Sequence, residues 1–219
     1  MKRFNHLFPQ VYAFGQLFRA AKKARQGNLH ASSTQRFFFH LEKELLELQE
    51  ELIAGNYQPG AYFYFTIRDP KERQISVAPF RDRVVHHAVV GVLEPIYERR
   101  FIHDSYACRK GKGTHRAVYQ AQRYLRKNRW FFKTDIQKFF DSVDQYRLME
   151  ILERKIKDED LLDLLRKITF NGGANGKGLP IGNLTSQFFA NIYLNELDWF
   201  VKQQLRCRHY IRYMDDFVL

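Results

Sequence analysis

Two apolar, strand-like runs each carry aspartate at their end, and this pattern constrains the fold more than any other feature. "WFFKTDI" contains Asp135, and "HYIRYMDDFVL" contains the adjacent pair Asp215 and Asp216. A carboxylate at the end of a buried strand is costly unless a cation compensates it, and the basic residues nearby in sequence are Arg212 and Lys133. If the two runs are neighbours in one sheet, three carboxylates converge and repel each other unless divalent cations lie between them.

Oxygen donors with little histidine or cysteine support favour Mg²⁺ or Mn²⁺ over zinc. Two such ions, about 3.5–4 Å apart, activate a 3′-hydroxyl and stabilise leaving pyrophosphate in nucleotidyl transfer. The pattern therefore predicts a two-ion polymerase centre, while a turn with no metal is the alternative for an isolated Asp-Asp pair. Cys108 and Cys207 lie far apart without a CxxC partner, which indicates neither a zinc site nor a disulfide.

Charge favours a polyanionic partner. The 219 residues carry a net charge of +12, and 45% hydrophobic content is enough for a sizeable core. No acidic residue occurs from Ser105 to Thr134, where aromatic residues alternate with basic ones. The basic residues of this stretch that we expect to contact nucleic acid are Arg109, Lys110, Lys112 and Arg116. A solvated basic helix face is the alternative.

Helical and strand-like segments alternate, which predicts an α+β fold. We expect a helix and then a flexible basic loop over residues 1–30, and one helix from Thr34 to Ala54. "AYFYFTIRDPKERQISVAP" predicts a hairpin around "DPKER". Five more helical segments are expected: in "RDRVVHHAVVGVLEPIYERR", over 114–127, around Arg147 to Ile156 and Asp160 to Ile168, and over 183–205. "HYIRYMDDFVL" is expected to close the sequence as a strand that turns at "YMDD". Without an apolar run near 18 residues or a signal peptide, we expect a soluble, cytoplasmic chain with no membrane contact.

The order of three motifs resembles that of a reverse transcriptase. "FFKTDIQKFFDSVD" is similar to the first catalytic palm motif, "GLPIGNLTSQFFANIYLNELD" to the second, and "YMDD" to the third. Upstream, "KERQISVAPFRDRVVHHAV" resembles the fingers segment. The resemblance implies a fingers domain and an incomplete palm, with an antiparallel sheet packed on helices and no thumb. It divides the chain into an N-terminal basic extension (1–33), fingers with part of the palm (34–129) and the palm (130–219).

The resemblance also implies roles for the acidic residues. Asp135, Asp215 and Asp216 would be catalytic, and with Ile136 they would form the site of two Mg²⁺ ions, or of Mn²⁺. Since the family continues into a primer-gripping segment and a helical thumb, we expect the isolated 219 residues to be inactive or weakly active and not to support processive synthesis.

Nucleotide-binding residues follow from the same motifs. Phe140 matches the aromatic residue that blocks a ribose 2′-hydroxyl, and a bulky ring can reject one added hydroxyl by steric clash; core packing is the alternative. Arg73 matches the arginine that grips the triphosphate, where a bidentate guanidinium suits phosphate oxygens, and Lys71 is a weaker candidate. In the second motif, the nucleotide-binding candidates are Ile181, Gly182 and Gln187.

The second motif indicates a branch of the family. Many reverse transcriptases have glutamine where Ile181 stands, whereas "IGNLTSQ" resembles the IGxxxSQ signature of diversity-generating retroelements. That branch implies error-prone copying of template RNA into cDNA from dNTPs and a primer, with a basic accessory protein as a further partner. The alternatives are a group II intron-like, retron-like or defence-associated bacterial reverse transcriptase, or an RNA-binding module without turnover.

Overall fold

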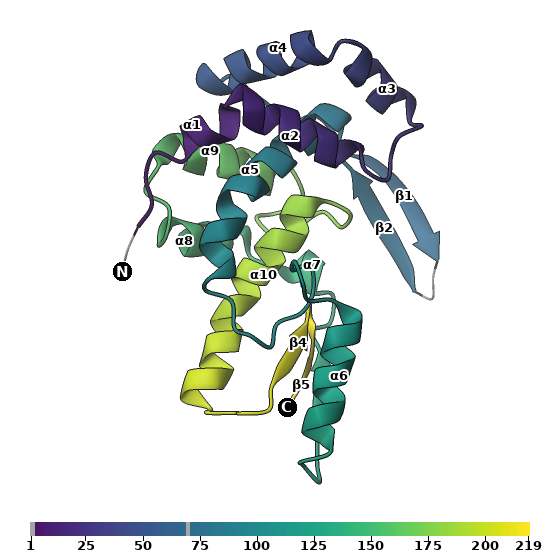
Figure 1. Cartoon of the computed structure of the whole chain (residues 1–219), viewed down its shortest axis with the longest axis vertical. Helices are drawn as coiled ribbons and strands as arrows, with labels where there is room; N and C mark the ends of the chain where they lie inside the picture. The colour runs from purple at the N-terminus through teal and green to yellow at the C-terminus, as the bar shows by residue number, and fades with distance from the viewer. Residues whose placement is uncertain (1–2, 69–70) are drawn as a thin grey trace.

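The structure is a computed structural model that describes residues 3–68 and 71–219. Helices lie at one end, and a small three-stranded sheet with one long helix beside it lies at the other (Figure 1). The elements are, in chain order, α1 (Phe8–Tyr12), α2 (Phe14–Arg25), α3 (Ser32–Phe39), α4 (Leu41–Ile53), β1 (Phe63–Arg68), β2 (Glu72–Val77), α5 (Phe80–Glu98), α6 (Thr114–Leu125), β3 (Lys133–Asp135), α7 (Phe139–Ser142), α8 (Gln145–Glu153), α9 (Glu159–Phe170), α10 (Leu184–Trp199), η1 (Phe200–Gln204), β4 (Ile211–Tyr213) and β5 (Asp216–Val218).

The N-terminal helices share the core of the rest of the chain. α2 packs along α5 and buries Leu17 and three alanines, which allow close approach of the two helices. The backbone amides of Leu7 and Phe8 donate to the Asp158 carboxylate ahead of α9 (2.6 and 2.9 Å). The expected flexible basic loop is therefore wrong in its first part, because "RAAKKAR" belongs to α2, where its alanines are buried and its cations face outward.

The single helix expected from Thr34 to Ala54 is two helices. The chain turns at His40, between α3 and α4, with φ −111° and ψ 29°. On α3, Phe37 packs against Phe80 of α5 with ring centroids 4.9 Å apart, whereas Leu45, Leu48 and Leu52 form the buried face of α4. Leucine spacing predicted a helix correctly, but the separate packing partners of the two halves break it.

The predicted hairpin is confirmed: β1 and β2 pair antiparallel, from Phe63 opposite Val77 to Arg68 opposite Glu72. Asp69 and Pro70 of the expected turn lie outside the described residues. Every β1 residue is exposed, so the hairpin stands away from the core beside the helices (Figure 1).

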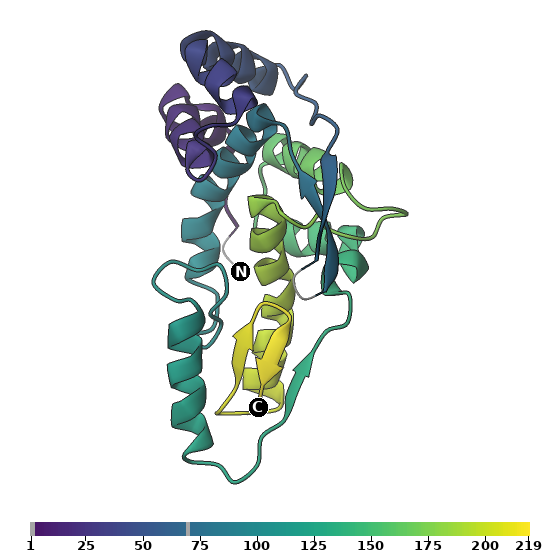
Figure 2. The ribbon, with the colours of Figure 1, turned by 90° about the vertical axis from the view of Figure 1, so that its right-hand side faces the viewer.

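The predicted closing strand, with its turn at "YMDD", is the β4–β5 hairpin. β4 and β5 pair antiparallel, and the turn between them has Met214 at φ 55°. The sheet order is β3-β5-β4, so the strand carrying Asp135 lies beside β5 and not beside β4, as Figure 2 shows. "WFFKTDI" is a regular strand only over Lys133–Asp135, although Phe132 and Leu219 exchange both backbone hydrogen bonds at 2.9 Å.

α10 is the central helix of this half, and most of its side chains are buried. The helix expected over 183–205 is α-helical only to Trp199 and then continues as the π-helix η1. No helix among residues 3–68 and 71–219 combines the length and apolar character needed to span a membrane.

Candidate catalytic site

The β3–β5 ladder brings the three predicted aspartates together. Asp135 is the register partner of Asp216, and the Ile136 amide donates to the Asp215 carbonyl at 3.3 Å. Asp215 lies in the turn that joins β4 to β5. The predicted convergence is thus present, but it arises because the chain reverses at Met214 and β5 pairs with β3.

The electrostatics of the cluster reflect this convergence. Partial burial is the main cause that raises the pKa of Asp215, and the charges of Asp216 and Asp135 raise it further. Arg73, from the fingers hairpin, lowers the same pKa, so its guanidinium acts on this carboxylate across the site. A cation placed among the three carboxylates would relieve their mutual repulsion.

The donor chemistry fits a hard divalent cation, because the three side chains offer only carboxylate oxygens. Ile136 has no side-chain donor and could contribute only its backbone carbonyl. In the part of the chain that the structure describes, however, no group of three His, Cys, Asp or Glu side chains is arranged closely enough to hold a metal ion.

A buried ion pair behind the cluster holds its turn in place. Arg212 and Asp198 are both fully buried, and the guanidinium donates to both carboxylate oxygens at 2.7 Å. Arg212 also donates to Asn191 Oδ1 (3.1 Å), to Ser105 Oγ (3.1 Å) and to the Met214 carbonyl (3.0 Å). The last bond ties the turn that carries Asp215 to α10.

This pair corrects one expectation. Arg212 was expected as a cation near the aspartates, but its guanidinium instead pairs with Asp198 within the fold. Sequence reasoning missed Asp198. An acidic residue at a buried position of an apolar helix was the available signal. Tyr210 reinforces the pair by donating to Asp198 Oδ1 at 2.8 Å.

Of the two adjacent phenylalanines, Phe139 belongs to the core. Its ring is 4% exposed and lies 5.4 Å from that of Phe140, which is only partly buried. The amide of Leu179, in the second motif, donates to the Phe140 carbonyl at 2.7 Å. Phe140 therefore sits between the first and second motifs, with part of its surface accessible.

The second-motif loop docks on the fingers hairpin. The Ser76 amide of β2 donates to the Ile181 carbonyl (2.7 Å), and the Ser76 carbonyl accepts from Asn183 Nδ2 (3.0 Å). Gly182 has φ +110°, and a Cβ there would lie 2.8 Å from Ile75 Cγ2. This glycine is needed for the contact between loop and hairpin. Gln187 points elsewhere, since its Oε1 accepts from Cys108 Sγ at 3.5 Å.

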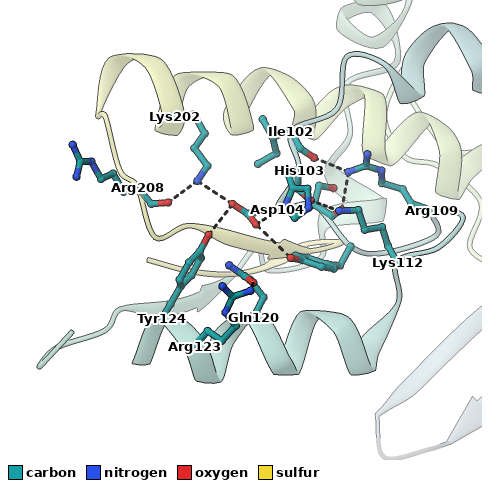
Figure 3. Close-up of polar contacts among 12 residues, drawn as sticks. Ile102, His103, Asp104, Arg109, Lys112, Gln120, Arg123, Tyr124, Lys202 and Arg208 are labelled. Carbon is teal, nitrogen blue, oxygen red and sulfur yellow. Dashed lines mark hydrogen bonds and ion pairs between the residues drawn. The ribbon is translucent and has the colours of Figure 1, made fainter. Parts of the chain in front are cut away.

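The basic loop after α5 is organised around a buried carboxylate, Asp104 (Figure 3). Asp104 accepts from Tyr124 (3.1 Å) and from Lys202 (3.3 Å), and it lies 3.1 Å from His103 Nδ1. Burial by itself raises the pKa of Asp104, but the contacts with His103, Lys202 and Tyr124 outweigh it and lower this pKa overall. The carboxylate thus ties the loop to α6 and η1.

The predicted nucleic-acid contacts divide into two groups. Arg109 is a structural residue: its side chain is 5% exposed, forms an ion pair with Glu98 at 2.6 Å, and donates to two backbone carbonyls at 2.7 Å. Lys112 and Arg116 also bond loop carbonyls, those of His103 and Gly111. The remaining candidate, Lys110, is exposed on this loop, as is Lys71, the weaker triphosphate candidate, on the hairpin.

Comparison with known proteins agrees with this arrangement. Residues 68–219 match the family model described as "Reverse transcriptase (RNA-dependent DNA polymerase)". Protein YkfC of Escherichia coli K12 is 31% identical over 179 residues, covering 75% of this chain and 47% of the relative. The group II intron-encoded protein LtrA of Lactococcus lactis subsp. cremoris is 32% identical over 172 residues, covering 74% of this chain and 29% of the relative.

The fold has neighbours among solved structures. A chain of the structure titled "Partial Cas6-RT-Cas1--Cas2 complex" aligns with a TM-score of 0.58 at 22% identity, covering 97% of this chain and 37% of that chain. The chain spans less than half the length of the two curated relatives described above. From the family match over 68–219, this chain belongs to the reverse transcriptase family.

Proposed function

We propose that this chain is the fingers and palm part of an RNA-directed DNA polymerase, with Asp135, Asp215 and Asp216 as its metal-binding catalytic residues. The observation that carries the proposal is the β3–β5 register, in which Asp135 and Asp216 face each other beside the turn bearing Asp215. Mg²⁺ or Mn²⁺ bound there would activate the primer 3′-hydroxyl and stabilise the leaving pyrophosphate.

The residues around the cluster would bind and select the nucleotide. Arg73 lies near enough to influence the Asp215 pKa, and its guanidinium would donate to oxygens of the dNTP triphosphate. Lys71 would add positive charge at the same hairpin. The accessible part of the Phe140 ring would exclude a ribose 2′-hydroxyl, and Ile181 with Gly182 would shape the adjacent backbone.

Metal binding and synthesis test the proposal separately. Asp215→Asn should weaken Mn²⁺ binding, measured by electron paramagnetic resonance, and should abolish RNA-templated dNTP incorporation in the protein that contains this chain. Asp160→Asn is the matched control, because Asp160 is an exposed aspartate of α9 outside the cluster. Unchanged Mn²⁺ affinity and unchanged incorporation in Asp215→Asn would contradict the assignment.

Within the family, the curated relatives favour a group II intron-type enzyme, since LtrA is named as a group II intron-encoded protein. "IGNLTSQ" supports the diversity-generating type instead, with copying errors opposite template adenines. Sequencing the cDNA products distinguishes the two: an excess of errors opposite adenine supports the retroelement assignment, and an even error spectrum supports the intron type. A basic accessory protein remains a prediction for the retroelement type alone.

A further inference from the structure

A cavity of about 150 Å³ lies where α5, α8 and α10 meet. Its polar lining comes from the end of α5 and Arg100 just beyond it, from the segment that follows α8, and from the second half of α10. None of the candidate catalytic or nucleotide-binding residues lines it. The polar and charged residues of its wall are Tyr97, Arg100, Arg154, Lys155, Asn195 and Glu196.

Three buried polar atoms of this wall lack a hydrogen-bond partner. They are Tyr97 Oη, Lys155 Nζ and Asn195 Oδ1, on residues that are 3%, 4% and 9% exposed. Only two other buried side-chain atoms in the described residues share this condition, and neither belongs to the cavity wall. An unpaired buried polar group destabilises the fold, and a charged one does so more strongly. Their concentration in one cavity wall therefore points to a polar ligand.

The charge of the wall is positive. Arg154 forms an ion pair with Glu196 at 3.0 Å, and the buried ammonium of Lys155 adds a positive charge that has no hydrogen-bond partner. Burial lowers the pKa of Lys155, the Arg100 charge lowers it further, and Glu196 acts in the opposite direction. A bound anion would stabilise this ammonium, whereas water could satisfy its hydrogen bonds without balancing its charge.

We propose that this cavity binds a phosphate group, either free or at the 5′ end of a nucleotide. The Lys155 ammonium and the Tyr97 hydroxyl donate to its oxygens, and Asn195 Oδ1 accepts from a protonated phosphate oxygen. Tetrahedral phosphate offers oxygens in several directions, as two donors and one acceptor on separate segments of the chain require. The volume suits one such group with bound water, since one water occupies about 30 Å³.

Inorganic phosphate is the first probe. Titration of the 219-residue chain with phosphate, against chloride at matched ionic strength, should raise the unfolding temperature in a saturable manner. Lys155→Met keeps the aliphatic stem and removes the charged donor. It should therefore raise the half-saturating phosphate concentration by about tenfold or more. Lys157→Met is the matched control, because Lys157 is exposed and outside the cavity wall.

Tyr97→Phe provides a second variant if Lys155→Met does not fold, and it should weaken phosphate binding severalfold. Equal phosphate responses in the wild type and the variant that folds would overturn the proposal and leave a water-filled cavity. Adenosine 5′-monophosphate and adenosine separate the sources once phosphate binds. If the monophosphate binds more tightly than phosphate, the site takes a nucleotide end. If the monophosphate binds equally or more weakly than phosphate, the site takes free phosphate. Equal binding of adenosine and its monophosphate would contradict a phosphate site.

Discussion

At the scale of single residues, the buried Arg212–Asp198 pair is the interaction whose loss should cost most. Asp198→Asn leaves a fully buried guanidinium without its counter-charge, so we expect a loss of about 3–5 kcal/mol in the free energy of unfolding. Denaturant unfolding followed by circular dichroism measures it. The turn bearing Asp215 should also loosen, because Arg212 bonds the Met214 carbonyl.

α10 supplies the control for this substitution. Glu196 lies on the same helix as Asp198 and pairs with Arg154, which follows α8, but the side chains of Glu196 and Arg154 are 50% and 42% exposed. Solvent screens such a pair, so Glu196→Gln should change the unfolding free energy by less than about 1 kcal/mol. Similar losses for both variants would show that burial does not determine the strength of the Arg212–Asp198 pair.

The coupling among the three aspartates predicts a pH effect. Asp135→Asn removes a charge that raises the pKa of Asp215, so this pKa should fall toward its ordinary value of 3.8 without reaching it, since burial and Asp216 persist. A carboxyl with a raised folded-state pKa contributes stability below its unfolded pKa, and that contribution is lost as pH rises through the folded pKa. The variant should therefore lose less stability between pH 3.8 and neutrality.

Carboxyl ¹³C NMR titration of the metal-free chain measures this pKa directly. Asp141→Asn serves as the control, because Asp141 is exposed and is not among the charges that shift Asp215. An unchanged Asp215 titration in Asp135→Asn would mean that the two carboxylates are too far apart to interact.

At the scale of elements, Gly182 joins the second-motif loop to β2. Gly182→Ala forces a side chain into a left-handed conformation and against Ile75, so we expect a loss of about 1–3 kcal/mol from strain, with a further loss from the clash. Chemical denaturation gives the total. Faster hydrogen exchange of the Ser76 amide would show that its bond to Ile181 is the contact that opens.

Gly27→Ala separates strain from clash. Gly27 also has positive φ, +80°, but a Cβ there would have no neighbour within 4 Å. Its substitution should cost the strain alone. If Gly182→Ala costs no more than Gly27→Ala, the loop can shift away from β2 and the docking contact is not tight.

Elements were predictable from sequence where local pattern determines them, and less so where packing does. Alternating aromatic and β-branched residues identified the β1–β2 hairpin, and leucine spacing identified α4. The break at His40 was not visible, because it depends on which helix each half contacts. The turn at "YMDD" was predicted, but its conformation was not, since Met214 is left-handed there and its residue type rarely is.

At the scale of the whole molecule, the aspartate cluster was predictable and its support was not. Apolar runs ending in acids indicated that residues distant in sequence would meet, and the sheet order shows which strand makes the contact. The Asp198 ion pair and the hydrogen bonds to Asp104 each join three or more segments of the chain. No local pattern therefore specifies them. Long-range polar networks of this kind require the tertiary fold before they can be recognised.

The net charge of +12 predicts salt-dependent RNA binding, but the basic residues should contribute unequally. Lys110 is exposed, so Lys110→Ala should lower affinity for single-stranded RNA and reduce the slope of log K against log salt by about 0.7.

Arg109 is bonded to Glu98 and two carbonyls, so Arg109→Ala should instead lower the unfolding temperature. Fluorescence anisotropy over a salt series measures RNA binding by both variants, with Lys43→Ala on α4 as the exposed control, and thermal unfolding measures their stability. A slope change in Arg109→Ala without a stability change would assign this arginine to RNA and not to the loop.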